Sequence, residues 1–368
     1  MEKIALIDPV GAKAGMDYYD LGLAYGFREN DVEVLLFSNF KDSKSLIKTY
    51  AVFGKFYSNK FFQAINFVVG MIRSCLLCKK KNVKTVILHL FSTQLMSFLT
   101  FFICKLFGFR IIAISHDVSS FASDDNGLFK NLIYKKWSSE IVVHNQFSFD
   151  ALCVSVAGIK DKVSIIKHGS FLEMPINKIS KSDALKNLNL DPSFKYILFF
   201  GQIKKVKKLD VLLKAMANVD SSIRLIVAGK VWKDDFLAYQ QIIDENKLSN
   251  KIILDIQFIS DHKRELYFKC ADLMVLPYQE IYQSGVLLMA MSYGIPALVS
   301  NIPPFKEIIS DKQNGFFFQS NNVKDLSQKI NAIISNEDQL KLVSIEGIDT
   351  MKSHHNWNKI AKSYLEFI

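Results

Sequence analysis

Two series of short segments rich in β-branched residues, each alternating with longer amphipathic segments, constrain the fold of this chain more than any other feature. The alternation is typical of parallel α/β sheets, because consecutive parallel strands need a crossover that is usually helical. The chain has 368 residues, 49% of them hydrophobic, which is enough for two packed cores. The candidate strands are 4–8, 33–37, 83–90, 110–115, 140–144 and 163–166 in the first series, and 196–200, 223–228, 252–256, 273–276, 297–299 and 316–318 in the second.

A polar segment separates the two series. It includes Pro175 and Pro192 and shows little apolar periodicity, which favours a linker. We therefore expect an α/β protein with two doubly wound Rossmann-like domains facing a central cleft, since such sheets bind ligands beyond the carboxyl ends of their strands. The predicted boundaries are 1–174 for an N-terminal domain, 175–194 for the linker, 195–352 for a C-terminal domain and 353–368 for a final helix.

The cysteines and the N-terminal residues indicate a cytoplasmic chain. Five cysteines lie mostly in apolar segments, and their odd number and irregular spacing argue for a reducing compartment. Cys75 and Cys78 form a C-x-x-C sequence in an apolar helical stretch without a second ligand pair, so we interpret them as structural. The chain enters a strand almost at once, and the apolar stretch 86–104 is interrupted by polar residues, so we expect neither a signal peptide nor a membrane span.

The basic residues are unevenly placed. The net charge is +10, and residues 43–116 contain eleven lysines and arginines but no aspartate or glutamate. Within this basic region, bulky apolar residues of 60–73 precede Lys79, Lys80 and Lys81, the pattern of an interfacial helix at an anionic membrane. We favour peripheral binding at the inner face of the cytoplasmic membrane, with a plain solvated face as the alternative. No nucleic-acid motif accompanies the charge, so nucleic acid is not expected as a partner.

One glycine-containing loop follows the first strand of each series. Asp8 precedes Gly11 and Gly15 at a junction between a strand and a helix, where glycines allow close approach of a ligand to the backbone. In the second series, Gly201 precedes Lys204 and Lys207, three residues apart, and an amphipathic helix follows. Lysines at the carboxyl end of a strand suit a pyrophosphate, although a solvated lysine run is the simpler alternative; we expect both side chains to be exposed.

A third loop opens a helix after the strand 273–276. Glu280 and Gln283 lie in the loop, and Ser284, Gly285 and Val286 begin the helix, whose free N–H groups can bind an anion.

Histidines recur near the strand ends of the first series. His116 follows the strand 110–115, and His89, His144 and His168 lie near other strand ends. Any one of them is more often structural than catalytic, and we select His116 as the candidate with a site role.

Together these residues resemble the family 4 glycosyltransferases of the GT-B superfamily, over nearly the whole chain. The most specific parts are 200–213, 271–277 and 284–296. The resemblance implies that the positions matching Lys204 and Lys207, and the backbone at Ser284, Gly285 and Val286, bind the donor phosphates. It further implies that His116 lies beside the transferred sugar, that Glu307 matches a frequent glutamate, and that the final helix returns to the first domain.

One position departs from the family pattern. The family usually carries two glutamates eight positions apart, and Met289 stands where the second, which holds the ribose hydroxyls, is expected. Glu280 lies one residue out of register with the first. Nucleotide recognition at this position is therefore an open question.

The resemblance implies transfer of a sugar, with retention, from a nucleotide diphosphate sugar to a hydroxyl acceptor, and the basic region suggests a lipid-linked glycan of surface polysaccharide synthesis. No D-x-D triplet occurs, so we expect lysines and helix dipoles, rather than a metal held by such a triplet, to meet the phosphate charge. No cofactor is expected. The alternatives are a nucleotide-sugar epimerase of the same architecture and a degenerate sugar-binding partner protein. A Rossmann oxidoreductase is disfavoured because the dinucleotide glycine pattern is missing.

Overall fold

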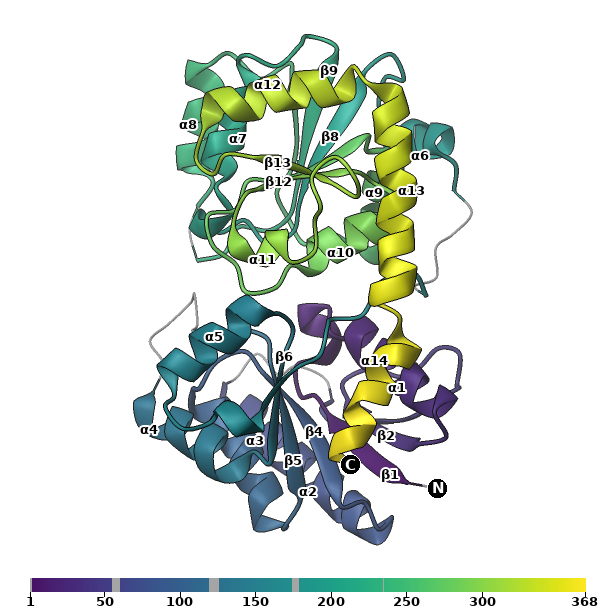
Figure 1. The fold of residues 1–368 in the computed structure, drawn as a ribbon, viewed down its shortest axis with the longest axis vertical. Helices are drawn as coiled ribbons and strands as arrows, with labels where there is room; N and C mark the ends of the chain where they lie inside the picture. The colour runs from purple at the N-terminus through teal and green to yellow at the C-terminus, as the bar shows by residue number, and fades with distance from the viewer. Residues whose placement is uncertain (1, 55–59, 119–125, 174–178, 234) are drawn as a thin grey trace. The chain divides into compact units, whose positions relative to one another are not determined.

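The computed structural model describes residues 2–54, 60–118, 126–173, 179–233 and 235–368, and these fold into two compact units (Figure 1). Unit 1 comprises Met1–Gly169 and His355–Ile368, and unit 2 comprises Ser170–His354. Each unit contains one sheet of parallel strands with helical crossovers, so the expected α/β fold class is confirmed. The two units are described separately below.

Unit 1 is built on a seven-stranded parallel sheet with strand order β3-β2-β1-β4-β5-β6-β7. Most residues of its strands are apolar and buried, as expected where helices cover both faces of a parallel sheet. Its elements are β1 (Lys3–Ile7), η1 (Gly11–Ala14), α1 (Asp17–Glu29), β2 (Glu33–Ser38), β3 (Lys48–Ala51), α2 (Lys60–Lys80), β4 (Thr85–Leu90), α3 (Leu95–Leu106), β5 (Arg110–Ser115), α4 (Gly127–Asn131), the π-helix η2 (Leu132–Trp137), β6 (Glu140–Val143), α5 (Gln146–Ser155), η3 (Lys160–Lys162), β7 (Val163–Ile165), α14 (Trp357–Tyr364) and η5 (Leu365–Phe367).

The strand β3 was not predicted from the sequence. It lies at the edge of the sheet, pairs only with β2 among the described strands, and has half-buried or exposed residues throughout. Its short sequence, Lys48-Thr-Tyr-Ala51, lacks the apolar run by which the buried strands are recognised.

The C-terminal helix α14 belongs to unit 1 and packs on α1, although more than 300 residues separate them in the chain (Figure 1). Trp357 is the anchor of this contact and is 3% exposed. A Cβ atom on Gly22 would lie 2.3 Å from the Trp357 ring, and one on Gly169 would lie 2.1 Å from it. Only glycine therefore lets the indole reach its place against α1 and the chain after β7.

Unit 2 is built on a six-stranded parallel sheet with strand order β10-β9-β8-β11-β12-β13. All six strands were predicted from the sequence, because each is a short apolar run bounded by turn residues. Its elements are α6 (Lys181–Asn187), β8 (Lys195–Phe200), η4 (Lys205–Lys207), α7 (Leu209–Met216), β9 (Ile223–Ala228), α8 (Leu237–Glu245), β10 (Ile252–Asp255), α9 (Asp261–Cys270), β11 (Leu273–Leu276), α10 (Gly285–Ser292), β12 (Ala297–Ser300), α11 (Pro303–Lys306), β13 (Phe316–Phe318), α12 (Val323–Ile334) and α13 (Glu337–His354).

The prediction of a linker over 175–194 needs correction. Residues 174–178 lie outside the described residues, but the rest includes α6, which packs on α9 within unit 2. Ser180 caps α6 by accepting a hydrogen bond from the Asp183 amide at 3.1 Å, and Lys181 forms an ion pair with Asp272. A capped helix with buried Ala184 and Leu185 is part of the domain.

Within the described residues, one helix is long and apolar enough to cross a membrane by length and composition. It is the segment Phe61–Lys80 of α2, with mean hydropathy 1.6, of which 33% is buried. The expectation from sequence had considered only the stretch 86–104, which forms β4 and α3. One face of α2 packs into unit 1 through Met71, Cys75 and Cys78, all 0% exposed. Both cysteines are free and buried, which fits a structural role.

Candidate functional site

Each sheet has one point at which the strand order reverses direction. In unit 1 it lies between β1 and β4, and in unit 2 between β8 and β11. At such a point the connections that follow the two adjacent strands run to opposite faces of the sheet. A crevice therefore opens at the carboxyl ends of these two strands, where a ligand can bind. The glycine loops predicted from the sequence follow β1 and β8, so both lie at these switch points.

In unit 2, the loop after β8 depends on a close contact between two glycines. Gly201 has a φ of 99° and Gly229, after β9, a φ of 154°, values that residues with a Cβ rarely adopt. A Cβ atom on Gly229 would lie 1.9 Å from the Gly201 carbonyl oxygen. The second glycine was missed in the sequence, although it directly follows the strand β9.

Lys207 is buried, which corrects the expectation of an exposed side chain. It is 9% exposed, its Nζ lies 5.1 Å from the centroid of the Tyr278 ring, and the same atom would lie 3.3 Å from a Cβ atom on Gly201. Burial, with a smaller contribution from the charge of Lys204, lowers the pKa of Lys207 to about 7. The ammonium group is buried because its side chain, which begins in the turn η4, packs between Gly201 and the Tyr278 ring.

Lys204 is half-buried at the same loop. Its Nζ lies 5.3 Å from the centroid of the Trp232 ring, a cation–π distance. The loop therefore presents two ammonium groups, one buried and one partly accessible, at the carboxyl end of β8.

The first turn of α10 lies against this lysine loop. Ser284 is its N-cap and accepts a hydrogen bond from the Leu287 amide at 3.2 Å, while a Cβ atom on Gly201 would lie 3.5 Å from Val286 Cγ2. The amide groups at Gly285 and Val286 thus begin an eight-residue helix beside Gly201. A helix N-terminus and a buried ammonium next to each other form a site for an anion such as phosphate.

The other site residues predicted in unit 2 are Glu280, Gln283 and Glu307. The loop that carries Glu280 and Gln283 is held by a hydrogen bond from the Gln279 amide to the Val206 carbonyl, 2.8 Å long, so it lies beside η4. Glu280 is exposed and Gln283 half-buried, whereas Glu307 is exposed at the end of α11. Their roles toward a sugar or nucleotide stay predictions.

Met289 lies in α10 and is 8% exposed. A methionine there contributes apolar packing and, unlike a glutamate, offers no carboxylate oxygen to accept hydrogen bonds from ribose hydroxyls.

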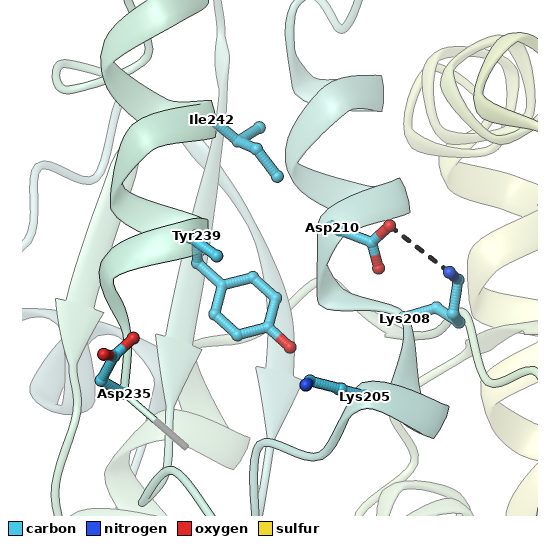
Figure 2. A pocket seen from close by; sticks show the side chains of 7 residues that line it. Lys205, Lys208, Asp210, Asp235, Tyr239 and Ile242 are labelled. Carbon is cyan, nitrogen blue, oxygen red and sulfur yellow. Dashed lines mark ion pairs between the residues drawn. The ribbon is translucent and has the colours of Figure 1, made fainter.

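A separate cavity of about 340 Å³ lies where α7 and α8 begin (Figure 2). Figure 2 shows Lys208 paired with Asp210 at 3.4 Å on one side of it and Tyr239 on the other. Lys204 and Lys207 do not line this cavity, so it is distinct from the anion site. Its lining residues are Lys205, Lys208, Asp210, Asp235, Ala238, Tyr239 and Ile242.

In unit 1, the loop after β1 is organised by Asp8. The Asp8 carboxylate accepts hydrogen bonds from the amides of Val10 and Gly11, at 2.8 and 2.9 Å. Gly11 has a φ of 50°, and a Cβ atom there would lie 2.3 Å from Ser38 Oγ, so only glycine fits. Gly15 has a φ of 70° with open space around it, so its glycine serves the backbone turn before α1.

The four histidines noted near strand ends gather around one aromatic ring. His89, His116, His144 and His168 come from four neighbouring strands, β4 to β7, and the ring centroid of Tyr19 in α1 lies 5.2, 5.2, 5.7 and 4.8 Å from theirs. Parallel strands place their carboxyl ends along one edge, which explains why residues far apart in sequence meet. His116 is therefore one member of a histidine cluster, with its ring stacked on Phe91 at 4.6 Å.

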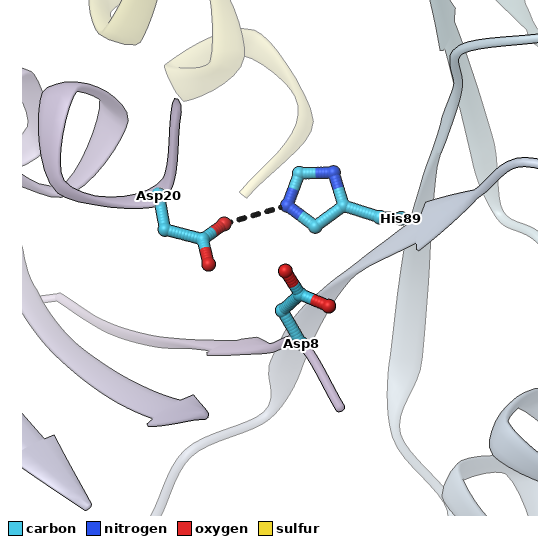
Figure 3. Close-up of side chains that lie close together, drawn as sticks. All are labelled: Asp8, Asp20 and His89. Atoms are coloured by element: carbon cyan, nitrogen blue, oxygen red, sulfur yellow. Dashed lines mark hydrogen bonds and ion pairs between the residues drawn. The ribbon is translucent and has the colours of Figure 1, made fainter. Parts of the chain in front are cut away.

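A chain of hydrogen bonds links His116 to an acidic residue that sequence reasoning missed. His89 Nδ1 lies 2.8 Å from His116 Nε2, and His89 Nε2 lies 2.8 Å from Asp20 Oδ1. Figure 3 shows Asp20 pointing at the imidazole of His89, with Asp8 beside both (Figure 3). Asp20 gave no signal in the sequence, because an aspartate in the first turn of a helix is usually a solvated, dipole-favoured residue.

Burial sets the protonation of this network. It raises the pKa of Asp8 to about 7, with a contribution from the charge of Asp20, and it raises the pKa of Asp20 well above its ordinary value. Burial and the neighbouring imidazoles lower the pKa of His116 well below its ordinary value, and burial lowers the pKa of His144 to about 4. Neutral imidazoles beside carboxyl groups that retain protons are thus the stable state at neutral pH.

Asp8, Asp20 and His89 also offer a donor set for a divalent cation, since their ligand atoms all lie within 4.8 Å of one another. The hydrogen bond between His89 Nε2 and Asp20 already uses two of those atoms. We interpret the group as a proton-sharing network, which needs no further occupant.

A cavity of about 280 Å³ opens beside this network within unit 1. Asp8 and His89 line one side, and residues of α2 and α3, including Phe67 and Met96, line the other. Phe67 belongs to the bulky apolar residues of 60–73 that the sequence predicted for a membrane-facing helix, but it is 8% exposed, so the expectation that it inserts into a membrane is corrected. The cavity therefore joins carboxyl and imidazole groups to a mainly apolar wall.

The outer surfaces of α2 and α3 carry exposed apolar side chains. Among those of α2, Phe61 is 67% and Phe62 52% exposed, and in α3 Leu95 is 57% and Leu106 68% exposed. Arg73, Lys79 and Lys80 are exposed on α2, and residues 55–59 of the basic region lie outside the described residues. Scattered apolar side chains are ordinary, but a run of them on two packed helices is not.

Comparison with known proteins identifies the family. Residues 180–362 match the family model of the glycosyl transferases group 1, a region that extends from α6 through unit 2 into α14. Among curated proteins, an uncharacterized glycosyltransferase of Methanocaldococcus jannaschii is 22% identical over 61% of this chain and 58% of its own length. A lipopolysaccharide core biosynthesis mannosyltransferase of Rhizobium meliloti is 24% identical over 50% of this chain and 54% of its own. The chain thus spans little more than half the length of these curated relatives.

Solved structures share the whole fold. Anabaena HepE, solved with UDP and glucose, superposes with a TM-score of 0.76 over 100% of this chain and 99% of its own, at 16% identity. Sucrose-phosphate synthase of Thermosynechococcus elongatus gives a TM-score of 0.75 over 100% and 98%, also at 16% identity. These likenesses establish the two-domain GT-B fold. Through its residues 180–362, the chain belongs to the glycosyl transferases of group 1.

Proposed function

We propose that this protein transfers a hexosyl unit from a nucleotide diphosphate sugar to a hydroxyl acceptor, with retention at the anomeric carbon and without a metal. The observation that carries the donor half of this proposal is the buried ammonium of Lys207 beside the first turn of α10. A cation without its counterion is costly to bury, and a diphosphate is the ligand that would offset that cost.

The chemistry of the leaving group supports the same assignment. When the bond from sugar to phosphate breaks, negative charge grows on the diphosphate, and preorganised cations and helix dipoles stabilise it. Lys204, Lys207 and the amides at Ser284, Gly285 and Val286 would supply these charges. The complex of Anabaena HepE, a protein of the same fold, with UDP and glucose supports a nucleotide-sugar donor for this chain.

Unit 1 would bind the acceptor and present His116 to the sugar. Neutral imidazoles hydrogen-bond hydroxyls without competing for the phosphates, and the cavity at Asp8 and His89 offers both polar and apolar walls. Such a cavity suits an acceptor that joins a glycan hydroxyl to an apolar carrier, as a lipid-linked glycan does.

The surface of α2 and α3 supports peripheral membrane binding. Exposed Phe61, Phe62, Leu95 and Leu106 would enter the interface, while Lys79 and Lys80 would contact anionic headgroups. We therefore place the protein at the inner face of the cytoplasmic membrane, in synthesis of a bacterial surface polysaccharide such as O-antigen, capsule or exopolysaccharide. The similarity to a lipopolysaccharide core mannosyltransferase supports this setting.

The test begins with ligand screening. The melting temperature is measured with UDP-, GDP-, dTDP-, ADP- and CMP-sugars, and a true donor at 100 times its dissociation constant adds about 2.7 kcal/mol to the free energy of unfolding. Mass spectrometry of lipid-linked acceptors incubated with the stabilising donor then detects the added sugar. Stabilisation by none of the donors would contradict the proposal. Epimerisation of the donor without an acceptor would identify an epimerase instead.

A second candidate function is sugar binding without turnover, and Met289 is the observation that favours it. A partner protein of this kind would bind the nucleotide sugar but form no product with any acceptor. Donor stabilisation combined with absent transfer, in the presence of active acceptor extracts, would support this candidate.

A further inference from the structure

The cavity of unit 1 beside Asp8 and His89 is lined on its other side by about one turn of each of two helices. The lining residues of these helices are Gln63, Asn66 and Phe67 in α2 and Met96, Ser97 and Thr100 in α3. Residues three or four apart share one face of a helix, so each helix turns a single face toward the cavity. A helical turn rises only about 5.4 Å. At about 280 Å³ the cavity is small, just below the roughly 300–1,000 Å³ of typical ligand sites.

The buried and exposed lining residues show which end of this cavity is open. Asp8 is 1% exposed, and the side chain of His89 is 2% exposed. Val10 and Met96 are 41% and 47% exposed, and Gln63 is exposed as well. The carboxyl and imidazole groups therefore lie at the inner end of the cavity, and Val10, Gln63 and Met96 surround its mouth.

A stripe of exposed apolar side chains on α2 begins beside this mouth. The members of this α2 stripe are Phe62, Ile65, Val69, Ile72 and Leu76. They repeat every three or four residues, so they share one face of the helix. Phe62 directly precedes Gln63 of the cavity lining, and exposed Leu95 of α3 directly precedes Met96. The apolar surface and the cavity are therefore continuous where the two helices begin.

The cavity and the α2 stripe require different chemistry from one ligand. The amides of Gln63 and Asn66 both donate and accept hydrogen bonds, as sugar hydroxyls do. The α2 stripe binds a hydrocarbon chain by removing its methylenes from water. A bilayer alone would cover the stripe and leave the cavity, whereas a free sugar would fill the cavity and leave the stripe. A sugar joined to a hydrocarbon chain is the ligand that fits both.

We propose that the cavity holds the acceptor sugar nearest to its apolar carrier, and that the carrier passes the mouth and lies along the α2 stripe. This identification rests on the proposed function. A depth of about one helical turn leaves room for about one or two sugar rings between the reacting hydroxyl and the carrier. The protein therefore extends a carrier that bears about one or two sugars. The class of reaction that supplies this acceptor is the attachment of a first sugar to the carrier.

The transfer itself is that of the proposed function. The oxygen of the acceptor hydroxyl forms a bond to the anomeric carbon of the donor sugar. The bond from that carbon to the diphosphate breaks, the nucleoside diphosphate leaves with the electron pair, and the hydroxyl proton passes to water. Only the inner end of the cavity takes part in this step, so the carrier affects which acceptors bind and not the chemistry.

The first experiment measures acceptor binding without a donor. The probes are the octyl and methyl glycosides of glucose, galactose and mannose, added below their micellar concentrations to the full-length protein and followed by calorimetry. Each buried methylene should tighten binding about fourfold, so at least one octyl glycoside should bind more than about tenfold tighter than its methyl counterpart.

Variants separate the cavity from the stripe. Asn66→Phe places a ring in the cavity and should abolish binding of the octyl glycoside. Ile65→Phe, on the neighbouring position of the α2 stripe, keeps the stripe apolar and is the matched control. The double variant Ile65→Ser and Val69→Ser should weaken the octyl glycoside about tenfold and leave the methyl glycoside unchanged, since only chain contacts are lost. Melting temperatures establish that each variant is folded.

The second experiment measures transfer with the donor that stabilises the protein. Acceptors carry one, two or four sugars on either a long hydrocarbon chain or a methyl group. The long chain should raise kcat/KM when the acceptor has one or two sugars. With four sugars the chain no longer reaches the α2 stripe from the cavity, so this gain should disappear.

Four results would overturn the proposal. They are equal affinity for octyl and methyl glycosides, octyl glycoside binding that is unchanged in folded Asn66→Phe, and a gain from the long chain that persists with four sugars. The fourth is a dimer in sedimentation that the double serine variant dissociates, because the α2 stripe would then be a contact between two copies of the chain. If no donor stabilises the protein and no transfer is found, the proposed function fails, yet glycoside binding still decides what the cavity holds.

Discussion

The two switch points of this protein have the same topology and opposite chemistry. At the β1/β4 point of unit 1, two buried carboxyl groups meet a row of neutral histidines. At the β8/β11 point of unit 2, a buried lysine meets the N-terminus of a helix. Burial shifts the pKa values of both groups toward their uncharged forms, upward for Asp8 and downward for Lys207.

The comparison shows that the scaffold determines where a site forms and a few side chains determine what it binds. A parallel sheet opens its strand ends at one edge regardless of sequence. The carboxyl and imidazole groups of unit 1 can exchange hydrogen bonds with hydroxyls, whereas the ammonium of unit 2 favours an anion. A transferase that joins a phosphate-bearing donor to a hydroxyl acceptor needs both kinds of site.

The largest effect should come from the imidazole in unit 1. His116→Ala should lower turnover by about 10² to 10⁴-fold, the range for a positioned group near the reacting atoms, and should leave donor affinity nearly unchanged. Single-turnover rates and donor binding measured separately check this. His144→Ala is the matched control, because it removes a buried ring of the same cluster that is not part of the hydrogen-bonded chain from His116 through His89 to Asp20. Equal losses in both variants would make His116 a packing residue.

A smaller effect should come from the ammonium in unit 2. Lys207→Met should weaken binding of the donor or its nucleoside diphosphate by about 10- to 150-fold, since a charge-assisted hydrogen bond contributes roughly 1.5–3 kcal/mol. Because the charged form is disfavoured by burial, the same variant should melt at a higher temperature at pH 7. Lys205→Met, on the exposed face of the same turn, is the control. Unchanged nucleotide affinity in folded Lys207→Met would remove the anion site from the proposal.

The outer surfaces of the two units should differ in membrane binding. Changing Lys79 and Lys80 to Gln should weaken binding to anionic vesicles by up to about 30-fold, since each base near an anionic leaflet contributes about 1 kcal/mol. Lys205→Met on unit 2 should have no effect. Co-sedimentation with anionic and zwitterionic vesicles at low and high salt measures this. Equal binding to both kinds of vesicle, unaffected by the double change, would show that the basic region is an ordinary solvated surface.

The smallest expected effect is a pH dependence of donor affinity, which should arise from Lys207 in unit 2. Lys207 has a folded pKa of about 7, below its ordinary value of 10.5, so the free protein loses this charge as the pH rises above 7. Anion binding needs the ammonium, so donor affinity should fall by at most about tenfold per pH unit above 7 and be flat below it. Binding measured by calorimetry should show proton uptake at pH 8. In Lys207→Met the slope should vanish, and a slope that persists would assign the titration to another group.

Lys207 should also make the free energy of unfolding depend on pH. A depressed pKa lowers the free energy of unfolding where the lysine is charged in the folded state, below about pH 7, and this cost disappears as the pH rises toward 10.5. The gain in melting temperature of Lys207→Met should therefore be largest at or below pH 7 and small near pH 10.

Local patterns in the sequence predicted the strands and the loops that carry the candidate sites. Periodicity and glycine positions are local properties, so the apolar strands and the loops at Gly11 and Gly201 could be placed without a structure. The edge strand β3 and the helix α6 could not, because a half-exposed strand and a short polar helix resemble loops in sequence.

The sequence by itself determined the fold class, the position of both candidate sites in the chain and the identity of His116 and Lys207 as candidates. Only the tertiary structure decided that Lys207 is buried, that Asp20 bonds His89, that four histidines surround Tyr19, and that Trp357 closes against Gly22 and Gly169. The reason is physical. Strand and turn preferences act over a few residues, whereas burial and pKa depend on groups that parallel strand packing brings together from distant parts of the chain.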